Sequence, residues 1–386
     1  MTALRPNTSL RTLQLGMSWL PEQAGNGLDR VFHALMRHLP MAGVQVEGLV
    51  AGSAGLGDGD VRSFAPDSAP LLRRFAGLRR AVRETLSARA PDVVAAHFAP
   101  YAFPALDLLR RHPLVVHFHG PWAEESRLEG DGALAVRSKG TIERMVYRRA
   151  ELLVVLSDAF AEILATRYRV DPRRIRIVPG GVDAARFDTG LTRAEARARL
   201  GWPPDRPILL SVRRLWRRMG LENLVEAFAA VHRAVPDARL HIAGKGPLAG
   251  ELQARIRAAG LDDHMRLLGF VPEAELPLAY RAADLSVVPS VALEGFGLVT
   301  VESLAAGTPV LVTPIGGLPE AVRDLSPDLV LPDATAPVLA DRLTAALRGG
   351  LDLPGEAACR RYACERFDWA AIARQMRGVY EEARHG

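Results

Sequence analysis

Two glutamates eight positions apart are the side chains of this sequence best suited to act on a ligand. Glu294 opens and Glu302 ends the run Glu-Gly-Phe-Gly-Leu-Val-Thr-Val-Glu. An apolar, strand-like segment precedes the run at residues 285–290, and a largely apolar segment follows it at 305–312. We therefore expect a strand, a glycine loop, a helix that begins near Gly297 and a second strand. Glu294 then lies in the loop and Glu302 on the helix, so their roles differ.

The two glycines of this run bear on what the loop can bind. Gly295 and Gly297 allow the backbone to approach a ligand closely, and the exposed N–H groups of a helix start attract anions. A diphosphate fits such a place. A tight turn with two surface glutamates is the simpler interpretation of Glu-Gly-Phe-Gly alone, whereas the full spacing between two apolar strands is more specific.

This pattern resembles the donor-binding signature of retaining glycosyltransferases with two Rossmann-like domains, the GT-B fold, and in particular of family 4. The resemblance implies that Glu302 binds the ribose hydroxyls of a nucleotide diphosphate sugar, the donor. It implies that Glu294 contacts the transferred sugar and that a backbone cradle holds the donor phosphates, formed by Gly295, Phe296, Gly297 and Leu298.

An arginine-rich turn follows the predicted strand at 207–212. Two guanidinium groups there can clamp a diphosphate and offset the charge that grows on it when the sugar leaves. The family pattern is Gly-Arg-Leu and, a few residues on, Lys-Gly, so Arg214 matches its arginine. Met219 stands where lysine is usual, and we expect Arg218 to supply that cation. The alternative is a solvated turn rich in arginine.

Three further segments match donor-binding loops of the family. Gly244 opens Gly-Lys-Gly-Pro-Leu-Ala after a strand, a pattern that could also indicate a dinucleotide-binding dehydrogenase. Its position away from the first strand of a domain disfavours that alternative. The resemblance implies that the backbone of Phe270 and Val271 reads the nucleobase, and that Gly27, in a glycine loop after the first strand, approaches the phosphates.

His119 is the candidate side chain of the N-terminal half. It ends the predicted strand at 114–119 and precedes Gly120, at the strand end where parallel sheets place ligands. A neutral imidazole there can hydrogen-bond a sugar or acceptor hydroxyl. We expect His117 on the opposite face of the strand and His97 in a structural role.

Composition bounds the architecture. A chain of 386 residues with 48% apolar content accommodates two α/β domains with a core each. Successive strand and helix segments predict two doubly wound, Rossmann-like domains facing across a cleft, at residues 1–188 and 189–366. The N-terminal domain would bind the acceptor and the C-terminal domain the donor. The resemblance implies that a helix at 367–386 crosses back to the first domain.

The net charge of +5 comes almost wholly from arginine and suits an anionic small molecule or membrane surface; we expect no nucleic-acid partner. The two cysteines and the lack of a long apolar run favour a reduced, cytoplasmic protein. Residues 71–88 form a basic amphipathic segment, either a solvated surface helix or one that contacts anionic lipid at the inner face of the plasma membrane. Residues 51–69 are rich in Gly, Asp and Ser and are expected to form a loop. Asp58-Gly59-Asp60 within it imitates a metal motif but is expected to be a solvated turn.

Together with these features, the resemblance implies a retaining transferase that moves a sugar from a UDP- or GDP-sugar to a hydroxyl acceptor, with His119, Arg214, Arg218 and Glu294 as its catalytic residues. No metal and no cofactor is expected. The acceptor would be a cell-surface polysaccharide or glycolipid, with an aminocyclitol or aminoglycoside natural product as the alternative. A sugar-nucleotide epimerase or hydrolase of the same fold and an inactive donor-binding subunit also remain open.

Overall fold

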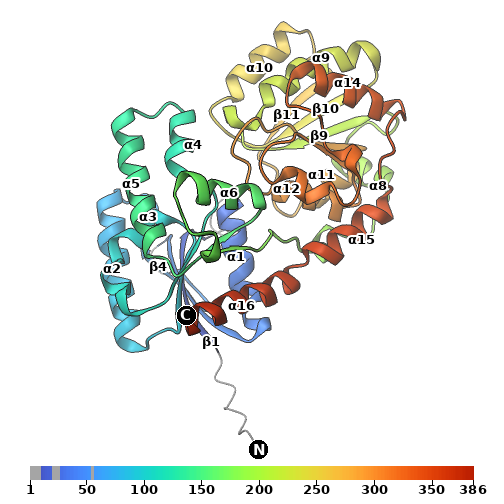
Figure 1. Ribbon diagram of the computed structural model, residues 1–386. Coiled ribbons are helices and arrows are strands. Elements are labelled where there is room, and N and C mark those ends of the chain that lie inside the picture. The colour runs from blue at the N-terminus through green and yellow to red at the C-terminus, as the bar shows by residue number, and fades with distance from the viewer. Residues whose placement is uncertain (1–9, 20–26, 54–55) are drawn as a thin grey trace, which may run out of the picture. The chain divides into compact units, whose positions relative to one another are not determined.

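The computed structural model describes residues 10–19, 27–53 and 56–386 (Figure 1). The chain divides into two compact units. The first contains the residues up to Gly180 together with Trp369–Gly386, and the second contains Gly181–Asp368. Each unit is a parallel β-sheet between layers of helices, the α/β architecture that alternating strand and helix patterns predict.

The first sheet has the strand order β3-β4-β2-β1-β5-β6-β7-β8 and is parallel except for the short β3–β4 pair. Its central strands are buried along their whole length, which explains their unbroken apolar sequences. The strands are β1 (Leu10–Ser18), β2 (Val44–Ala51), β3 (Gly57–Asp58), β4 (Val61–Ala65), β5 (Val93–Ala96), β6 (Leu114–His117), β7 (Leu152–Val155) and β8 (Ile175–Ile177).

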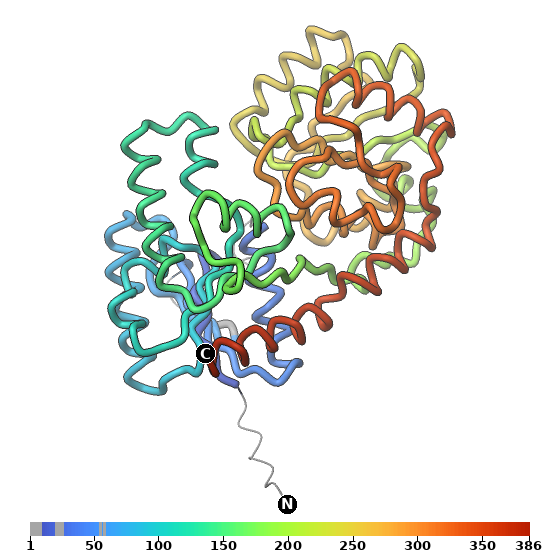
Figure 2. The backbone as a smooth tube through the Cα atoms, in the orientation of Figure 1, coloured from blue at the N-terminus to red at the C-terminus, as the bar shows by residue number. Residues whose placement is uncertain are grey.

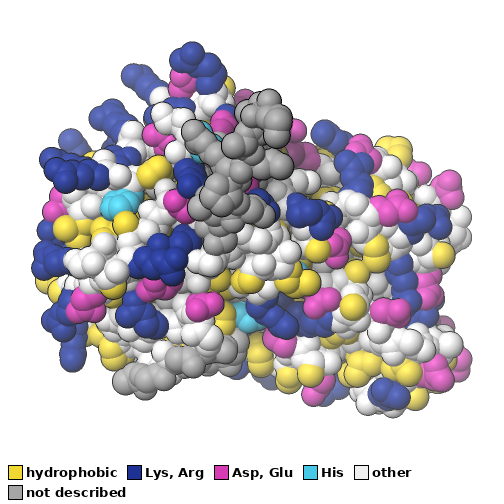
Figure 3. Space-filling model, turned by 90° about the horizontal axis from the view of Figure 1, so that it is seen from below, with side chains coloured by type: hydrophobic (Ala, Val, Ile, Leu, Met, Phe, Trp, Pro, Cys, Tyr) yellow, Lys and Arg dark blue, Asp and Glu magenta, His cyan; other side chains and the backbone are white. Residues whose placement is uncertain are grey.

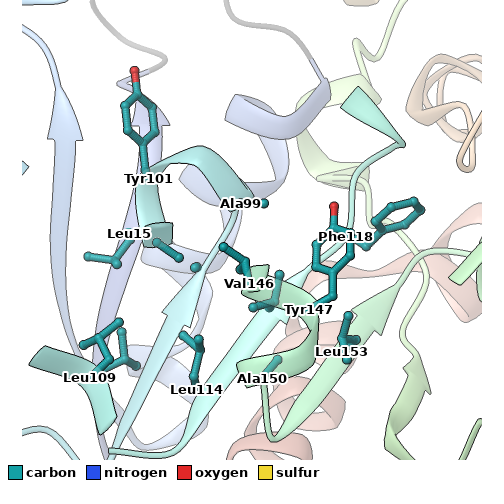
Figure 4. Close-up of a cluster of buried hydrophobic side chains, with 14 of the residues drawn as sticks. Leu15, Ala99, Tyr101, Leu109, Leu114, Phe118, Val146, Tyr147, Ala150 and Leu153 are labelled. Atoms are coloured by element: carbon teal, nitrogen blue, oxygen red, sulfur yellow. The ribbon is translucent and has the colours of Figure 1, made fainter. Parts of the chain in front are cut away.

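The helices of the first unit are α1 (Gly27–His38), α2 (Leu71–Ala88), α3 (Ala99–Ala102), α4 (Trp122–Leu128), α5 (Ala133–Arg149), α6 (Asp158–Arg167) and α16 (Trp369–His385). Short 3₁₀ turns lie at Pro40–Ala42, Phe103–Ala105, Leu108–Arg111 and Pro172–Arg174. Figure 4 shows part of the core between the sheet and helices α3 and α5, where Leu15, Leu114 and Val146 are fully buried.

The second sheet has the order β11-β10-β9-β12-β13 and is parallel throughout. Its strands are β9 (Ile208–Val212), β10 (Arg239–Ala243), β11 (Met265–Gly269), β12 (Leu285–Val288) and β13 (Val310–Val312). The helices are α7 (Ala184–Phe187), α8 (Arg193–Leu200), α9 (Leu221–Ala234), α10 (Ala249–Ala258), α11 (Leu276–Ala282), α12 (Leu298–Ala305), α13 (Leu318–Val322), α14 (Ala336–Leu347) and α15 (Glu356–Phe367), with 3₁₀ turns at Arg217–Met219 (η6) and Pro327–Leu329 (η7).

Both sheets reverse their strand order once. In the first sheet β1 lies between β2 and β5, and in the second β9 lies between β10 and β12. At such a point the loops that leave the carboxyl ends of the two neighbouring strands run to opposite faces of the sheet, which leaves a crevice that ligands use. The fold therefore directs attention to the loops that follow β9 and β12.

The second unit begins before the predicted domain boundary at residue 188. Helix α7 packs against α11, α12 and α15, and Phe187 is fully buried there. Arg186 forms an ion pair of 2.5 Å with Glu273. These contacts draw residues 181–187 into the second unit. At the other end, α15 stays with the second unit and only α16 joins the first.

The predicted loop at residues 51–69 is partly wrong. Val61–Ala65 forms strand β4, which pairs in parallel with β2 and extends the first sheet. This strand has no regular alternation of apolar and polar residues, since Phe64 and Ala65 are adjacent, and glycines and aspartates precede it, so its sequence carries only a weak strand signal. Gly59 and Asp60 form the turn between β3 and β4, and Asp60 is exposed, as expected for a solvated turn.

Helix α16 belongs to the first unit and packs against α1, β5 and β6; the tube in Figure 2 shows this last segment returning to the beginning of the chain. Tyr380 anchors it. The hydroxyl group of this fully buried residue lies 3.0 Å from His117 Nε2 and 3.3 Å from Gln14 Nε2. The contact joins the two ends of the chain through polar groups that have no access to water.

Replacing Tyr380 by Phe should destabilise the protein by about 1–3 kcal/mol, because buried polar atoms of His117 and Gln14 lose a hydrogen-bond partner. Chemical denaturation measures the change. Tyr362→Phe is the matched control, since the Tyr362 hydroxyl is buried without a hydrogen-bond partner among the described residues. An equal loss of stability in both variants would contradict the importance of the Tyr380 contacts.

Candidate functional site

The crevice of the second sheet contains a buried ion pair. Arg213 directly follows β9, and Glu294 lies in the loop after β12. Their side chains are 6% and 13% exposed. Arg213 Nη2 donates to Glu294 Oε2 and, over 2.6 Å, to Ser290 Oγ, while the Ser290 hydroxyl donates to the same carboxylate oxygen over 3.1 Å. The Glu294 carboxylate thus links the loops that follow β9 and β12, two strands that are neighbours in the sheet but distant in the sequence.

The charge state of Glu294 follows from these neighbours. Burial by itself would raise the pKa of the carboxyl group. The positive charges of Arg213 and Arg218, with the hydrogen bonds from Arg213 and Ser290, outweigh burial, so the pKa of Glu294 lies below its usual value. Glu294 is therefore an anion at neutral pH, although water has little access to it.

Arg218 and the chain before Glu294 complete this side of the site. Arg218 Nη1 donates to the carbonyl oxygen of Leu293 over 3.0 Å, and the Arg218 carbonyl accepts the N–H of Val291 over 3.0 Å. Leu293 has a φ of 50°, a left-handed conformation that costs a non-glycine residue free energy. The hydrogen bond from Arg218 holds this strained residue in place beside Glu294.

Glycines let the surrounding loops pack closely. A Cβ atom on Gly316, whose φ is 57°, would lie 1.9 Å from the Glu294 carbonyl oxygen, and the next residue, Gly317, donates its N–H to that oxygen. Gly220 and Gly244 approach the backbones of Pro289 and Arg213 equally closely. The positions of Arg213 and Glu294 are therefore fixed by main-chain contacts as well as by their side chains.

The predicted phosphate cradle lies at the start of α12. Gly297 is left-handed with a φ of 77°, and the helix begins at Leu298, so the prediction of a helix start near Gly297 is confirmed. Glu302 lies one turn into this helix and is buried. The Tyr280 hydroxyl donates to Glu302 Oε2 over 3.1 Å, which fixes the carboxylate from the neighbouring helix α11. Sequence analysis did not identify Tyr280 as a partner.

The segments predicted to contact the nucleobase and phosphates lie at the same edge of the sheet. Gly244 follows β10 and donates its N–H to the carbonyl of Gly269, the last residue of β11. Phe270 comes next and is 42% exposed, with Lys245 Nζ 5.2 Å from its ring centroid. Val271 is half-buried. The carboxyl ends of β9, β10, β11 and β12 thus bring together the donor-site residues predicted for the second unit.

Arg213 is the site residue that sequence analysis missed. Arg214, chosen because it matches Gly-Arg-Leu, is exposed, whereas Arg213 occupies the glycine position of that pattern and is buried. Its Nη2 also contacts the sulfur of Met219. Arg213 could have been recognised because it directly follows a strand at the point where the strand order reverses. The point of reversal is known only once the order of strands in the sheet is known.

The first unit holds three histidines at the carboxyl ends of β5 and β6. His97 and His117 are stacked with ring centroids 3.9 Å apart, and His119 lies about 6 Å from both. His117 therefore shares the cluster with His119, and its predicted place on the opposite face is wrong. Residues two apart in an extended chain point to the same side. Hydrogen bonds from His97 to Gln14 and from His117 to Tyr380 are consistent with structural roles.

Burial keeps the histidines neutral. It lowers the pKa of His119 to about 4 and the pKa values of His97 and His117 well below their usual range. Nε2 of His119 and Nδ1 of His97 are buried and have no hydrogen-bond partner among the described residues. Neutral imidazoles can donate or accept one hydrogen bond at each nitrogen, so this edge of the sheet can bind hydroxyl groups.

The cluster is not arranged as a metal centre. Its ligand atoms lie within 4.8 Å of one another, but the three rings are within 20° of parallel. Because lone pairs of imidazole lie in the ring plane, stacked parallel rings cannot direct them to one ion. The expectation that no metal is needed stays a prediction.

Glu143 on α5 fixes the loop that follows His119. Its carboxylate accepts the backbone N–H groups of Trp122 and Ala123 over 2.7 and 3.3 Å, and the hydroxyl of Tyr168 over 2.9 Å. Burial raises the pKa of Glu143 despite these hydrogen bonds. Of the remaining predicted residues, Gly27 is the exposed first residue of α1, and the loop before it lies outside the described residues.

Comparison with known proteins defines the class. Among solved structures, a sucrose-phosphate synthase from Thermosynechococcus elongatus superposes with a TM-score of 0.80 at 22% identity, covering 96% of this chain and 98% of the other. The Anabaena protein HepE, solved with UDP and glucose, gives a TM-score of 0.79 at 19% identity over 97% and 100% of the two chains. The fold is that of the GT-B glycosyltransferases.

Sequence comparison gives the family. Residues 25–186 match the model of Glycosyltransferase Family 4, and residues 192–366 match Glycosyl transferases group 1. A D-inositol 3-phosphate glycosyltransferase of Segniliparus rotundus is 35% identical over 67% of this chain and 56% of its own length. A mannosylfructose-phosphate synthase of Agrobacterium fabrum is 32% identical over 47% and 41%. The chain belongs to family 4 and matches about half the length of these relatives.

Substituting Gly316 by Ala should disturb the site through the backbone of Glu294. The new methyl group collides with the Glu294 carbonyl, and the left-handed backbone adds a cost of about 1–2 kcal/mol. We expect a lower melting temperature and weaker nucleotide binding, measured by thermal unfolding with and without UDP. Gly250→Ala on α10, where a Cβ meets nothing within 4 Å, is the control and should not destabilise the protein. Equal behaviour of the two variants would contradict this account.

Proposed function

We propose that this protein transfers a sugar from a nucleotide diphosphate sugar to a hydroxyl group of an acceptor, with retention of configuration at the anomeric carbon. The observation that carries the proposal is the gathering of Arg213, Arg218, Glu294 and the start of α12 at the strand reversal of the second sheet. The glycosyltransferase activity for which the relatives are named and the UDP-glucose complex of HepE support a sugar nucleotide as the donor.

Each side chain has a proposed role. Glu302, held by Tyr280, would bind the ribose hydroxyls, and the amides at the start of α12 would hold the diphosphate. Glu294 would bind a hydroxyl of the transferred sugar. Arg214 and Arg218 would offset the negative charge that develops on the leaving diphosphate. Phe270 and Val271 would contact the nucleobase through their backbones, with Gly244 beside them.

In the proposed reaction, the bond from the anomeric carbon to the phosphate oxygen breaks while the bond to the acceptor oxygen forms on the same face. The acceptor proton passes to the leaving phosphate oxygen. His119, neutral because it is buried, would hydrogen-bond a hydroxyl group of the sugar or acceptor. Arginine and backbone N–H groups would supply the charge stabilisation, so we propose that the step requires neither a metal ion nor a cofactor.

For the acceptor, we propose a cell-surface polysaccharide or glycolipid. Helix α2 supports contact with an anionic membrane because Leu71 and Leu72 are 45% and 81% exposed beside Arg73. None of the described helices combines the length and apolar character needed to span a bilayer. On the face in Figure 3, basic side chains are interspersed with acidic ones, so the net charge is not concentrated there.

A small cyclitol or sugar phosphate is the second candidate acceptor. The relatives named D-inositol 3-phosphate glycosyltransferase and mannosylfructose-phosphate synthase favour it. Product analysis separates the candidates: a soluble glycoside forms with an inositol phosphate, whereas a lipid-linked product requires membrane extract. Turnover of donor without any acceptor would instead indicate an epimerase or hydrolase.

A thermal-shift screen with UDP-glucose, GDP-mannose and ADP-glucose tests the donor. The cognate sugar nucleotide should raise the melting temperature, because a ligand that binds only the native state stabilises it by about 2.7 kcal/mol at one hundred times its dissociation constant. Glucose 1-phosphate is the control and should have little effect. Failure of every nucleotide to stabilise the protein would contradict the proposed donor class.

Replacing Arg214 by Ala should remove most of the turnover and leave the fold intact, since its side chain is exposed. Loss of one group that stabilises transition-state charge typically lowers kcat by about 10²–10³. Arg257→Ala, an exposed arginine of α10, is the control. Unchanged turnover in Arg214→Ala would remove this residue from the mechanism.

A further inference from the structure

A buried cation, Arg213, lies beside Glu294, the carboxylate proposed to bind the sugar, and the roles proposed above do not explain its presence. Removing two charges from water costs several kcal/mol per ion, so a buried pair is poor evidence for added stability. The pair lies where the loops after β9 and β12 diverge, at the ligand-binding edge of the sheet. A role in binding or reaction explains its presence better than stability does.

The hydrogen bonds of the carboxylate are one-sided. Oε2 of Glu294 accepts from both Arg213 and Ser290. No donor within the described part of the chain bonds to the other oxygen, Oε1. Oε1 is also not one of the fully buried atoms without a hydrogen-bond partner, so it is accessible from outside the protein. One oxygen is therefore saturated by the protein, and the other keeps its lone pairs for a ligand.

The main chain allows neither partner to move easily. Arg213 donates its N–H to the Ala243 carbonyl over 2.8 Å, and Gly244 lies directly against the Arg213 carbonyl. Glu294 is held by Gly317 and follows the left-handed Leu293. Strained backbone persists where the surroundings enforce it, as at ligand-binding sites. The direction of the carboxylate is thus set before a ligand arrives.

We propose that Arg213 is a positioning residue: it keeps Glu294 ionised and turned so that Oε1 accepts a hydrogen bond from a hydroxyl group of the transferred sugar. The inference rests on the proposed function and deepens it, because it assigns recognition of the sugar, as distinct from the nucleotide, to this pair. Arg213 itself touches neither the diphosphate nor the reacting atoms.

The first test compares two probes, UDP and UDP-glucose, with GDP and GDP-mannose as the alternative pair if those stabilise the wild type. Arg213→Met should weaken binding of the sugar nucleotide at least tenfold and leave the affinity for the bare nucleoside diphosphate within about threefold. Glu294→Gln should show the same split. Equal weakening for UDP and UDP-glucose in Arg213→Met would overturn the proposal, because it would place Arg213 on the diphosphate.

The second test needs no substrate. Among the described residues, the charged groups that act on Glu294 are Arg213 after β9 and Arg218 on η6, and burial is the largest single influence on its pKa. We expect that, once Arg213 is removed, burial outweighs Arg218 and the hydrogen bond from Ser290. The carboxyl pKa in folded Arg213→Met then lies above its unfolded value, so the contribution of Glu294 to stability is lost as the pH rises. The melting temperature of this variant should fall further below the wild type at about pH 8 than at about pH 5.

Two further variants complete the design. Arg213→Met/Glu294→Gln removes both charges and should recover most of the melting temperature without recovering discrimination for the sugar. Arg255→Met, an exposed partner of Glu251 on α10, is the control and should change neither measurement. A deficit in Arg213→Met that is independent of pH and persists in the double variant would overturn the proposal. If the stability pattern appears but no nucleotide binds, the effect of Arg213 on Glu294 is supported and the proposed function fails.

Discussion

The candidate site depends on a carboxylate that stays charged away from water. Desolvation opposes the ionisation of Glu294, and two guanidinium groups reverse that preference. The balance is local, because it requires Arg213 and Ser290 within hydrogen-bonding distance of one oxygen atom. The order of the strands and the close-packed glycine loops of the second unit keep these groups at that distance.

The sheet supplies the first part of this arrangement. Strand β9 lies at the centre of the second sheet with β10 on one side and β12 on the other, so the residues that follow β9 and β12 emerge side by side. Glycines at 220, 244 and 316 then allow neighbouring backbones to approach to a distance that a Cβ atom would prevent. A rigid edge results, with Glu302 fixed on α12 by Tyr280.

The first unit presents a different chemistry at the corresponding edge of its sheet. Its three histidines are neutral because they are buried, and two of their nitrogen atoms have no partner within the described ranges. Gln14 and Tyr380 are hydrogen-bonded to each other and to His97 and His117, respectively, and Glu143 holds the loop that follows His119. Neutral hydrogen-bonding groups in one unit and fixed charges in the other match the proposed division into acceptor binding and binding of the sugar nucleotide.

The sequence by itself determined the architecture and most of the second-unit site. Strand and helix periodicity gave two α/β units, and the spacing from Glu294 to Glu302 between apolar strands located the helix start at Gly297, because these signals are local. The tertiary structure decided which arginine meets Glu294. Arg213 and Glu294 are 81 positions apart, so only the order of strands in the sheet brings them together. The same holds for Tyr380, whose contact with Gln14 spans 366 positions and follows from the packing of α16.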